Sequence, residues 1–104
     1  MLTLDGLAAP LRVLRLLAAD FGHLPAPSVD LSYIYPERLT LRFHDGLDAF
    51  EAWREALAVP AECVTHQVQS HGMTRVLEAS TVYAGAEVHL YGYSDGPTPV
   101  GGAA

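Results

Sequence analysis

The sequence predicts an α+β domain: a two-layer sandwich in which an antiparallel sheet of about five strands carries two helices on one face. Two stretches place apolar residues at helical spacing, and five shorter stretches alternate apolar with polar residues. Their order is helix, two strands, helix, three strands (α-β-β-α-β-β-β). Links between consecutive strands are short, which favours antiparallel pairing within each group, and the helices can bury their apolar stripes only on one sheet face.

The first helix is expected from about residue 5 to residue 21. Its apolar stripe recurs at spacings of three and four: Leu7, Leu11, Leu14, Leu17 and Phe21. Pro10 fits only a first turn, so the regular helix should begin near residue 8 or 9, and Gly22 is well placed to end it.

A hairpin is expected next. Val29, Leu31 and Tyr33 alternate with polar residues, Pro36 favours a turn over residues 35–38, and Leu39, Leu41 and Phe43 form the buried side of the return strand. One face of this hairpin should therefore be buried.

The second helix, expected over residues 45–59, is the element around which the chain is organised. Asp45 is placed as its N-cap, Pro60 ends it, and Phe50 and Trp53 give it the largest apolar surface to bury. We interpret Trp53 as a core residue rather than a ligand-stacking one, because it lies in register with the other apolar positions of the helix.

Three strands should follow, over residues 64–69, 73–83 and about 86–91, with a turn at residues 70–72. Alternation in the middle strand is imperfect, so the sequence leaves its facing open and suggests a bulge or burial on both faces. The predicted domain covers residues 1–93, and the Gly-, Pro- and Ala-rich residues 94–104 are expected to form a disordered tail. The expected core comprises Leu14, Leu41, Phe43, Phe50, Trp53, Leu57, Val88 and Leu90.

Composition narrows the classes of function. The 104 residues carry 6 basic and 12 acidic side chains, and the basic ones are all arginines that form no basic stripe, which argues against binding to a phosphate backbone. With one cysteine, no intramolecular disulfide can form. Charged residues and Pro10 interrupt the apolar N-terminal run, and no stretch reaches the length of a membrane span. We therefore expect a cytoplasmic protein with no membrane contact.

The expected functional surface is the sheet face that the helices leave open. Its candidate binding or interface residues are Arg42, His44, Glu87, His89, Tyr91 and Tyr93. Tyr, His and Arg are residue types enriched at protein interfaces, which favours a homodimer or another protein partner. A merely solvated sheet face stays open as the alternative.

Motifs for catalysis and for metal binding are missing from the sequence. The five histidines form no metal-ligand pattern, and there is no nucleophile elbow, P-loop or dinucleotide fingerprint. The best acid–base set combines His44, His89 and Glu87 with Tyr91 or Tyr93. We expect no catalytic residue, no cofactor and no metal, a partly buried His66, and a buried, unreactive Cys63.

Three stretches resemble those of a group of small uncharacterised proteins from high-GC bacteria, often encoded near integrative or conjugative elements. They read LPAPSVDLSYIYPERLTLRFHD, FEAWREAL and TRVLEASTVYAGAEVHLYGY, and the resemblance covers most of residues 20 to 93. It implies an accessory or regulatory protein of mobile DNA and assigns no catalytic residue. The sequence thus favours a non-enzymatic interaction module acting as a homodimer; the alternative is a small-molecule-binding protein or enzyme with a His/Tyr/Glu site on the sheet.

Overall fold

The computed structural model describes residues 1–44, 46–68 and 74–95. Its elements, in chain order, are η1 (Leu4–Leu7), α1 (Ala8–Asp20), β1 (Ser28–Leu31), β2 (Arg38–Phe43), α2 (Leu47–Ala56), η2 (Ala61–Cys63), β3 (Thr65–Val68), β4 (Thr74–Tyr83) and β5 (Ala86–Asp95). The predicted α+β class, with a five-stranded and mostly antiparallel sheet and two α-helices, is confirmed. Among the described residues, no helix is long and apolar enough to cross a membrane.

The strands lie in the order β1-β2-β5-β4-β3. Pairing is antiparallel within each sequence group, β1 with β2 and β3 with β4 with β5. The expectation of a wholly antiparallel sheet was wrong at one junction, because β2 and β5 pair in parallel from Arg38↔Glu87 to Phe43↔Gly92. These two strands are separated in sequence by α2, β3 and β4, and a connection of that length permits parallel pairing where a short turn does not.

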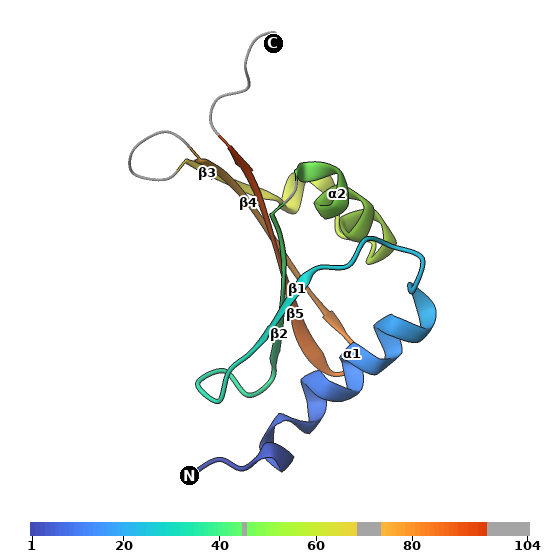
Figure 1. Cartoon of the computed structure of the whole chain (residues 1–104), viewed down its shortest axis with the longest axis vertical. Helices are drawn as coiled ribbons and strands as arrows, with labels where there is room; N and C mark the ends of the chain where they lie inside the picture. The colour runs from blue at the N-terminus through green and yellow to red at the C-terminus, as the bar shows by residue number, and fades with distance from the viewer. Residues whose placement is uncertain (45, 69–73, 96–104) are drawn as a thin grey trace, which may run out of the picture.

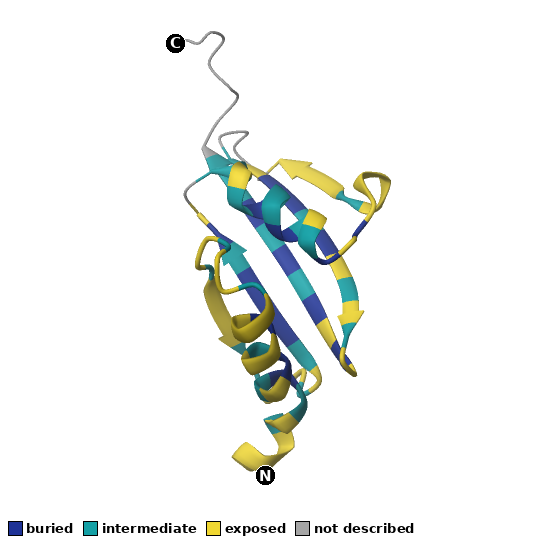
Figure 2. Cartoon of the chain, turned by 90° about the vertical axis from the view of Figure 1, so that its right-hand side faces the viewer, coloured by how far each residue is buried: buried dark blue, intermediate teal, exposed yellow. Residues whose placement is uncertain are grey.

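Both α-helices lie on the same side of the sheet (Figure 1), and the core fills the space beneath them. Seen from the helix side, the central strand β5 alternates buried with less buried positions (Figure 2), whereas β2 has three consecutive buried residues, Leu39, Thr40 and Leu41. The buried hydrophobic residues of the chain include seven of those expected from the sequence, namely Leu41, Phe43, Phe50, Trp53, Leu57, Val88 and Leu90.

Helix α1 packs through a slightly different stripe from the one expected. Its buried residues are Pro10, Val13 and Leu17, with Val13 fully buried, whereas Leu14 is only partly buried against the core. The leucine spacing pointed to a face centred on Leu14. The buried stripe is rotated toward Pro10. Pro10 lies in the first turn, as expected, where its ring can be buried without interrupting a helical hydrogen bond.

Helix α2 is anchored by Trp53 and ends in a backbone motif that could not be predicted from the sequence. The Trp53 indole Nε1 donates a 2.7 Å hydrogen bond to the Pro25 carbonyl in the connector after α1. At the C-terminus, Ala58 has φ +60° and Val59 N donates to the Arg54 carbonyl at 3.0 Å, which forms a Schellman motif built on alanine instead of glycine. The helix thus ends at Ala56, ahead of Pro60, and the expected Asp45 cap lies outside the described residues.

The facing of β4 is settled by its register with β5. Pairing runs without a bulge from Thr74↔Asp95 to Tyr83↔Ala86, which places Leu77 and Ala79 on the helix side with Leu90. Gly92 lies where α2 crosses β5. A Cβ atom there would stand 2.9 Å from the Cβ of Phe50, so only glycine allows this close approach.

Two expectations near β3 were wrong. Cys63, the last residue of η2, is exposed and not buried. His66 is also exposed, because β3 is a four-residue edge strand whose residues are all exposed. Strand β5 extends through Asp95, past the expected boundary at residue 93. The expected turn at 70–72 and residues 96–104 of the expected tail lie outside the described residues.

Candidate functional site

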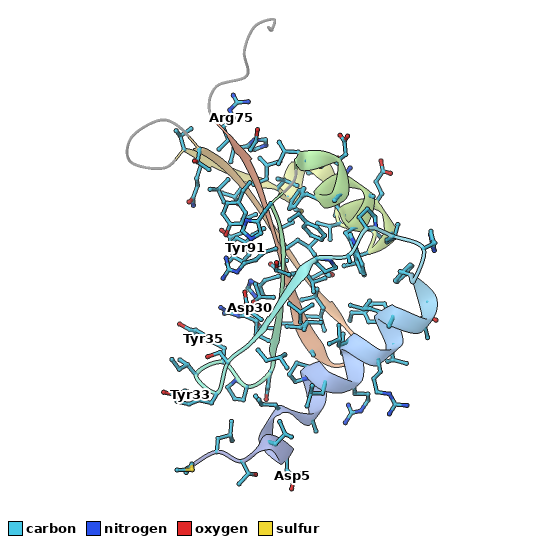
Figure 3. The ribbon with its side chains drawn as sticks, in the orientation of Figure 1. Asp5, Asp30, Tyr33, Tyr35, Arg75 and Tyr91 are labelled. Atoms are coloured by element: carbon cyan, nitrogen blue, oxygen red, sulfur yellow. The ribbon has the colours of Figure 1, made fainter. Side chains whose placement is uncertain are left out.

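The sheet face opposite the helices, termed here the outer face, carries a connected set of polar and aromatic side chains. Because side chains alternate along a strand and neighbouring strands are in register, one parity of each strand gathers on this face. It includes Asp30 of β1, Arg38, Thr40 and Arg42 of β2, Glu78, Ser80 and Val82 of β4, and Glu87, His89, Tyr91 and Tyr93 of β5. Figure 3 shows Asp30 and Tyr91 on the side away from the helices, with Tyr33 and Tyr35 beyond them.

Arg42 is the centre of one cluster. Its Nε donates to Asp30 Oδ2 at 2.5 Å, its Nη1 donates to the Tyr93 hydroxyl at 2.6 Å, and its guanidinium carbon lies 5.0 Å from the centroid of the Tyr91 ring. The hydrogen bond to Asp30 is the main cause that raises the pKa of Arg42, partly opposed by burial. Arg42 is therefore a fixed, charge-compensated element that joins β1, β2 and β5.

The two tyrosines beside Arg42 are held by further contacts. Tyr91 donates its hydroxyl to Glu78 Oε2 at 3.2 Å, and burial, followed by the Glu78 charge, raises the pKa of Tyr91. The ring of Tyr93 stacks on His44 with centroids 4.9 Å apart and planes inclined by 4°. Both rings thus have a fixed orientation before any partner binds.

A second cluster lies on the same face around Glu87. Its Oε1 is 3.1 Å from His89 Nε2 and 3.7 Å from Arg38 Nε, so one carboxylate serves two cationic or potentially cationic groups. The Arg38 guanidinium carbon stands 4.1 Å from the centroid of the Tyr35 ring. Within the described part of the chain, Arg38 Nε and His89 Nδ1 are buried atoms without a hydrogen-bond partner.

A hollow of about 210 Å³ opens between the two clusters. It is lined by Asp30 and Ser32 from the β1 side, Arg38 and Arg42 from β2, and the rings of Tyr35 and Tyr91, with Thr40 between the arginines. Its lining is therefore polar and aromatic, and contains two guanidinium groups against one carboxylate.

The link between β1 and β2 adds an exposed apolar tip. Tyr33, Ile34 and Tyr35 are 73%, 62% and 52% exposed, and the link projects away from the helices (Figure 1). The sequence missed this feature because Tyr33 was assigned to the strand, whereas β1 ends at Leu31. The apolar run at 33–35 immediately before Pro36 was the available signal for an exposed turn.

All six residues expected at the site reach the outer face or its edge, but they do not form the acid–base set considered from the sequence. His89 contacts Glu87, whereas His44 stacks on Tyr93, which lies about 13 Å from His89 along the strand at about 3.3 Å per residue. No described hydroxyl group hydrogen-bonds to His89, so its imidazole is not paired with a nucleophile. Among the described residues, no group of three or more His, Cys, Asp or Glu could hold a metal ion.

Sequence reasoning missed Asp30, Arg38 and Glu78. Each shares the outward parity of its own strand, but its role depends on which strands are neighbours, and the pairing of β2 with β5 is not encoded by a local turn. Comparisons with protein-family models, with curated proteins and with solved structures found no match to this chain. The outer face is thus interpreted from its geometry alone.

Proposed function

We propose that this chain is a small, non-enzymatic protein-interaction module that forms a homodimer through the outer face. The observation that carries the proposal is the ordered set of arginine and tyrosine side chains on a sheet face that no described element covers. The proposal treats the fold as a two-layer sandwich in which the helices close one face and leave the other for a partner. It also places the protein in the cytoplasm, as an accessory protein of a mobile element.

Composition and preorganisation support an interface. Tyr and Arg are the residue types that most often supply binding energy at protein–protein contacts, and both are enriched here. Arg42, Tyr91 and Tyr93 are already fixed by their own hydrogen bonds, so a partner would order few additional rotamers on binding. Tyr33 and Ile34 add exposed apolar surface beside them.

The charges of the outer face support a second copy as the partner. A two-fold axis sets the same patch against itself, so a self-binding face needs both signs of charge. Here Arg38 and Arg42 lie among Asp30, Glu78 and Glu87, and the rotation can bring arginines of one copy to carboxylates of the other.

Solution mass tests the proposal. Light scattering over a range of concentrations should give a dimer for the wild type and a monomer for the double variant His89→Ala/Tyr91→Ala. Tyr33→Ser/Ile34→Ser should weaken the dimer without touching the core, because both side chains are largely exposed.

The matched control is Leu4→Ser/Leu16→Ser, which changes two exposed apolar residues of η1 and α1, away from the outer face. It should remain a dimer. A wild type that stays monomeric at every concentration would remove the homodimer, and loss of the dimer in the control alone would move the interface to α1.

A small-molecule site is a second candidate, favoured by the 210 Å³ hollow between Arg38 and Arg42. Its open lining, which combines charged and hydroxyl groups with two tyrosine rings, distinguishes it from a packed interface core.

A further inference from the structure

The two arginines that line the outer-face hollow have different charge partners. Arg42 holds Asp30 at 2.5 Å in a direct hydrogen bond, which compensates its charge. Among the described residues, the carboxylate partner of Arg38 is Glu87, at 3.7 Å from its Nε, and that carboxylate is closer to His89. The Nε atom of Arg38 is buried and has no hydrogen-bond partner among the described residues, although 30% of the side chain is exposed.

We propose that this hollow binds a carboxylate group at the guanidinium of Arg38. A guanidinium is a planar donor fork whose geometry matches a carboxylate, and such charge-assisted pairs are stronger than neutral hydrogen bonds. Thr40 and Ser32 line the same hollow and supply hydroxyl donors for the second oxygen. The stack on Tyr35 holds the guanidinium plane in place before the anion arrives.

The charge count selects a singly charged anion. Within the lining of the hollow, two guanidinium groups face the single carboxylate of Asp30, which leaves one positive charge. Glu87 lies outside this lining and offsets that charge in part, because it is 3.7 Å from Arg38 Nε and closer to His89. Asp30 and the nearby Glu87 repel a second negative charge, and the chain as a whole carries a formal charge of −6. A phosphate, which carries about 1.5 to 2 negative charges at pH 7, is therefore a poorer match than a carboxylate.

The test is an NMR titration of the arginine Nε–H signals with acetate. Because the six basic residues are all arginines, this spectrum has few signals to assign. Acetate should produce a saturable shift at Arg38 and a smaller one at Arg42. Sodium chloride and inorganic phosphate at matched ionic strength should produce weaker shifts. No saturable shift at Arg38, or an equal shift with chloride, overturns the proposal, and tighter binding of phosphate overturns the choice of a carboxylate.

Three variants separate the site from general charge effects. Arg38→Gln and Arg38→Lys lack the Arg38 Nε–H signal, so their affinity for acetate is read from the Arg42 Nε–H shift. Arg38→Gln should raise the Kd for acetate by about tenfold or more, equivalent to about 1.4 kcal/mol per factor of ten. Arg38→Lys keeps the positive charge and loses the planar pair of donors, so its Kd for acetate should lie between those of Arg38→Gln and the wild type. Arg12→Gln, on the exposed surface of α1, should bind acetate as the wild type does. Equal affinity in all three variants would show that the shift is non-specific.

A second arm identifies the source of the carboxylate. Acetate stands for a free organic acid, and the capped peptide Ac-Ala-Glu-Ala-NH₂ stands for an acidic side chain of a protein partner. Shifts with both extend the site to partner side chains, and shifts with acetate alone restrict it to free acids; each result supports a carboxylate site. The readout is at Arg38 itself, so the inference does not depend on the homodimer and can fail or succeed separately from it.

Discussion

Replacing Trp53 tests how the two helices are tied to the sheet. Trp53 is buried, with 5% of its area exposed. The centroid of its ring lies 6.2 Å from that of Phe21 and 6.3 Å from that of Phe43. The indole also donates to the Pro25 carbonyl. Trp53→Ala removes the buried ring, both aromatic contacts and that hydrogen bond, and should lower the free energy of unfolding by about 3–5 kcal/mol.

Trp53→Phe separates packing from hydrogen bonding. It keeps a buried ring and loses the N–H donor, whose hydrogen bond contributes about 0.5–1.5 kcal/mol, so its effect should be about 1–2 kcal/mol with the lost ring volume included. Because small domains are stable by only about 5–15 kcal/mol, the two variants should be clearly resolved.

Urea denaturation followed by far-UV circular dichroism is the appropriate assay, because Trp53 is the only tryptophan and its replacement removes the fluorescence signal. The m-values should match, so that shifts in midpoint report stability. Leu4→Ala, at a 70% exposed position of η1 away from the outer face, is the control and should change stability by less than about 0.5 kcal/mol. A Trp53→Ala variant within about 1 kcal/mol of the wild type would refute the assignment of Trp53 as the anchor of α2.

Three further predictions concern the sheet. Gly92→Ala should lower the free energy of unfolding in urea by about 1–3 kcal/mol, because its Cβ would stand 2.9 Å from that of Phe50; an unchanged midpoint would contradict the close packing of α2 on β5. Ala84→Asn should stabilise the chain by about 0.5–1 kcal/mol, since residue 84 has φ +51° in a two-residue β4–β5 turn that asparagine suits better; a lower melting temperature would argue against this turn geometry. Burial and Glu78 raise the pKa of Tyr91, so the folded state keeps the hydroxyl proton at a pH where the unfolded chain has released it. The stability that results is complete below about pH 10 and is lost as the pH rises above that value. Urea titrations from neutral pH upward should show that the free energy of unfolding falls less with pH in Tyr91→Phe than in the wild type. An equal fall with pH in both proteins would exclude a contribution from Tyr91.

The fold could be predicted wherever local pattern determines structure. The 3.6-residue period located both helices, and alternation located β2 and β5, because each pattern reflects which side of one element meets the core. The parallel junction between β2 and β5 could not be predicted, since it depends on how two hairpin groups meet after α2 crosses the sheet. The end of α2 could not be predicted for a different reason. Ala58 adopts a positive φ, which is usual for glycine at this position and not for alanine.

The outer face shows where pattern stops determining chemistry. Parity along β2 and β5 was enough to place Arg42 and Tyr91 on one surface, because it needs no knowledge of neighbouring strands. The electrostatic state of each arginine depends on those neighbours. Arg42 and Arg38 are identical residues on one strand and one face, yet β1 brings Asp30 to the first at hydrogen-bond distance, while the second shares Glu87 at 3.7 Å. A guanidinium whose charge is compensated holds strands together, whereas one that is incompletely compensated can bind an anion. The proposed binding role therefore belongs to Arg38, which the sequence pattern did not identify as a site residue.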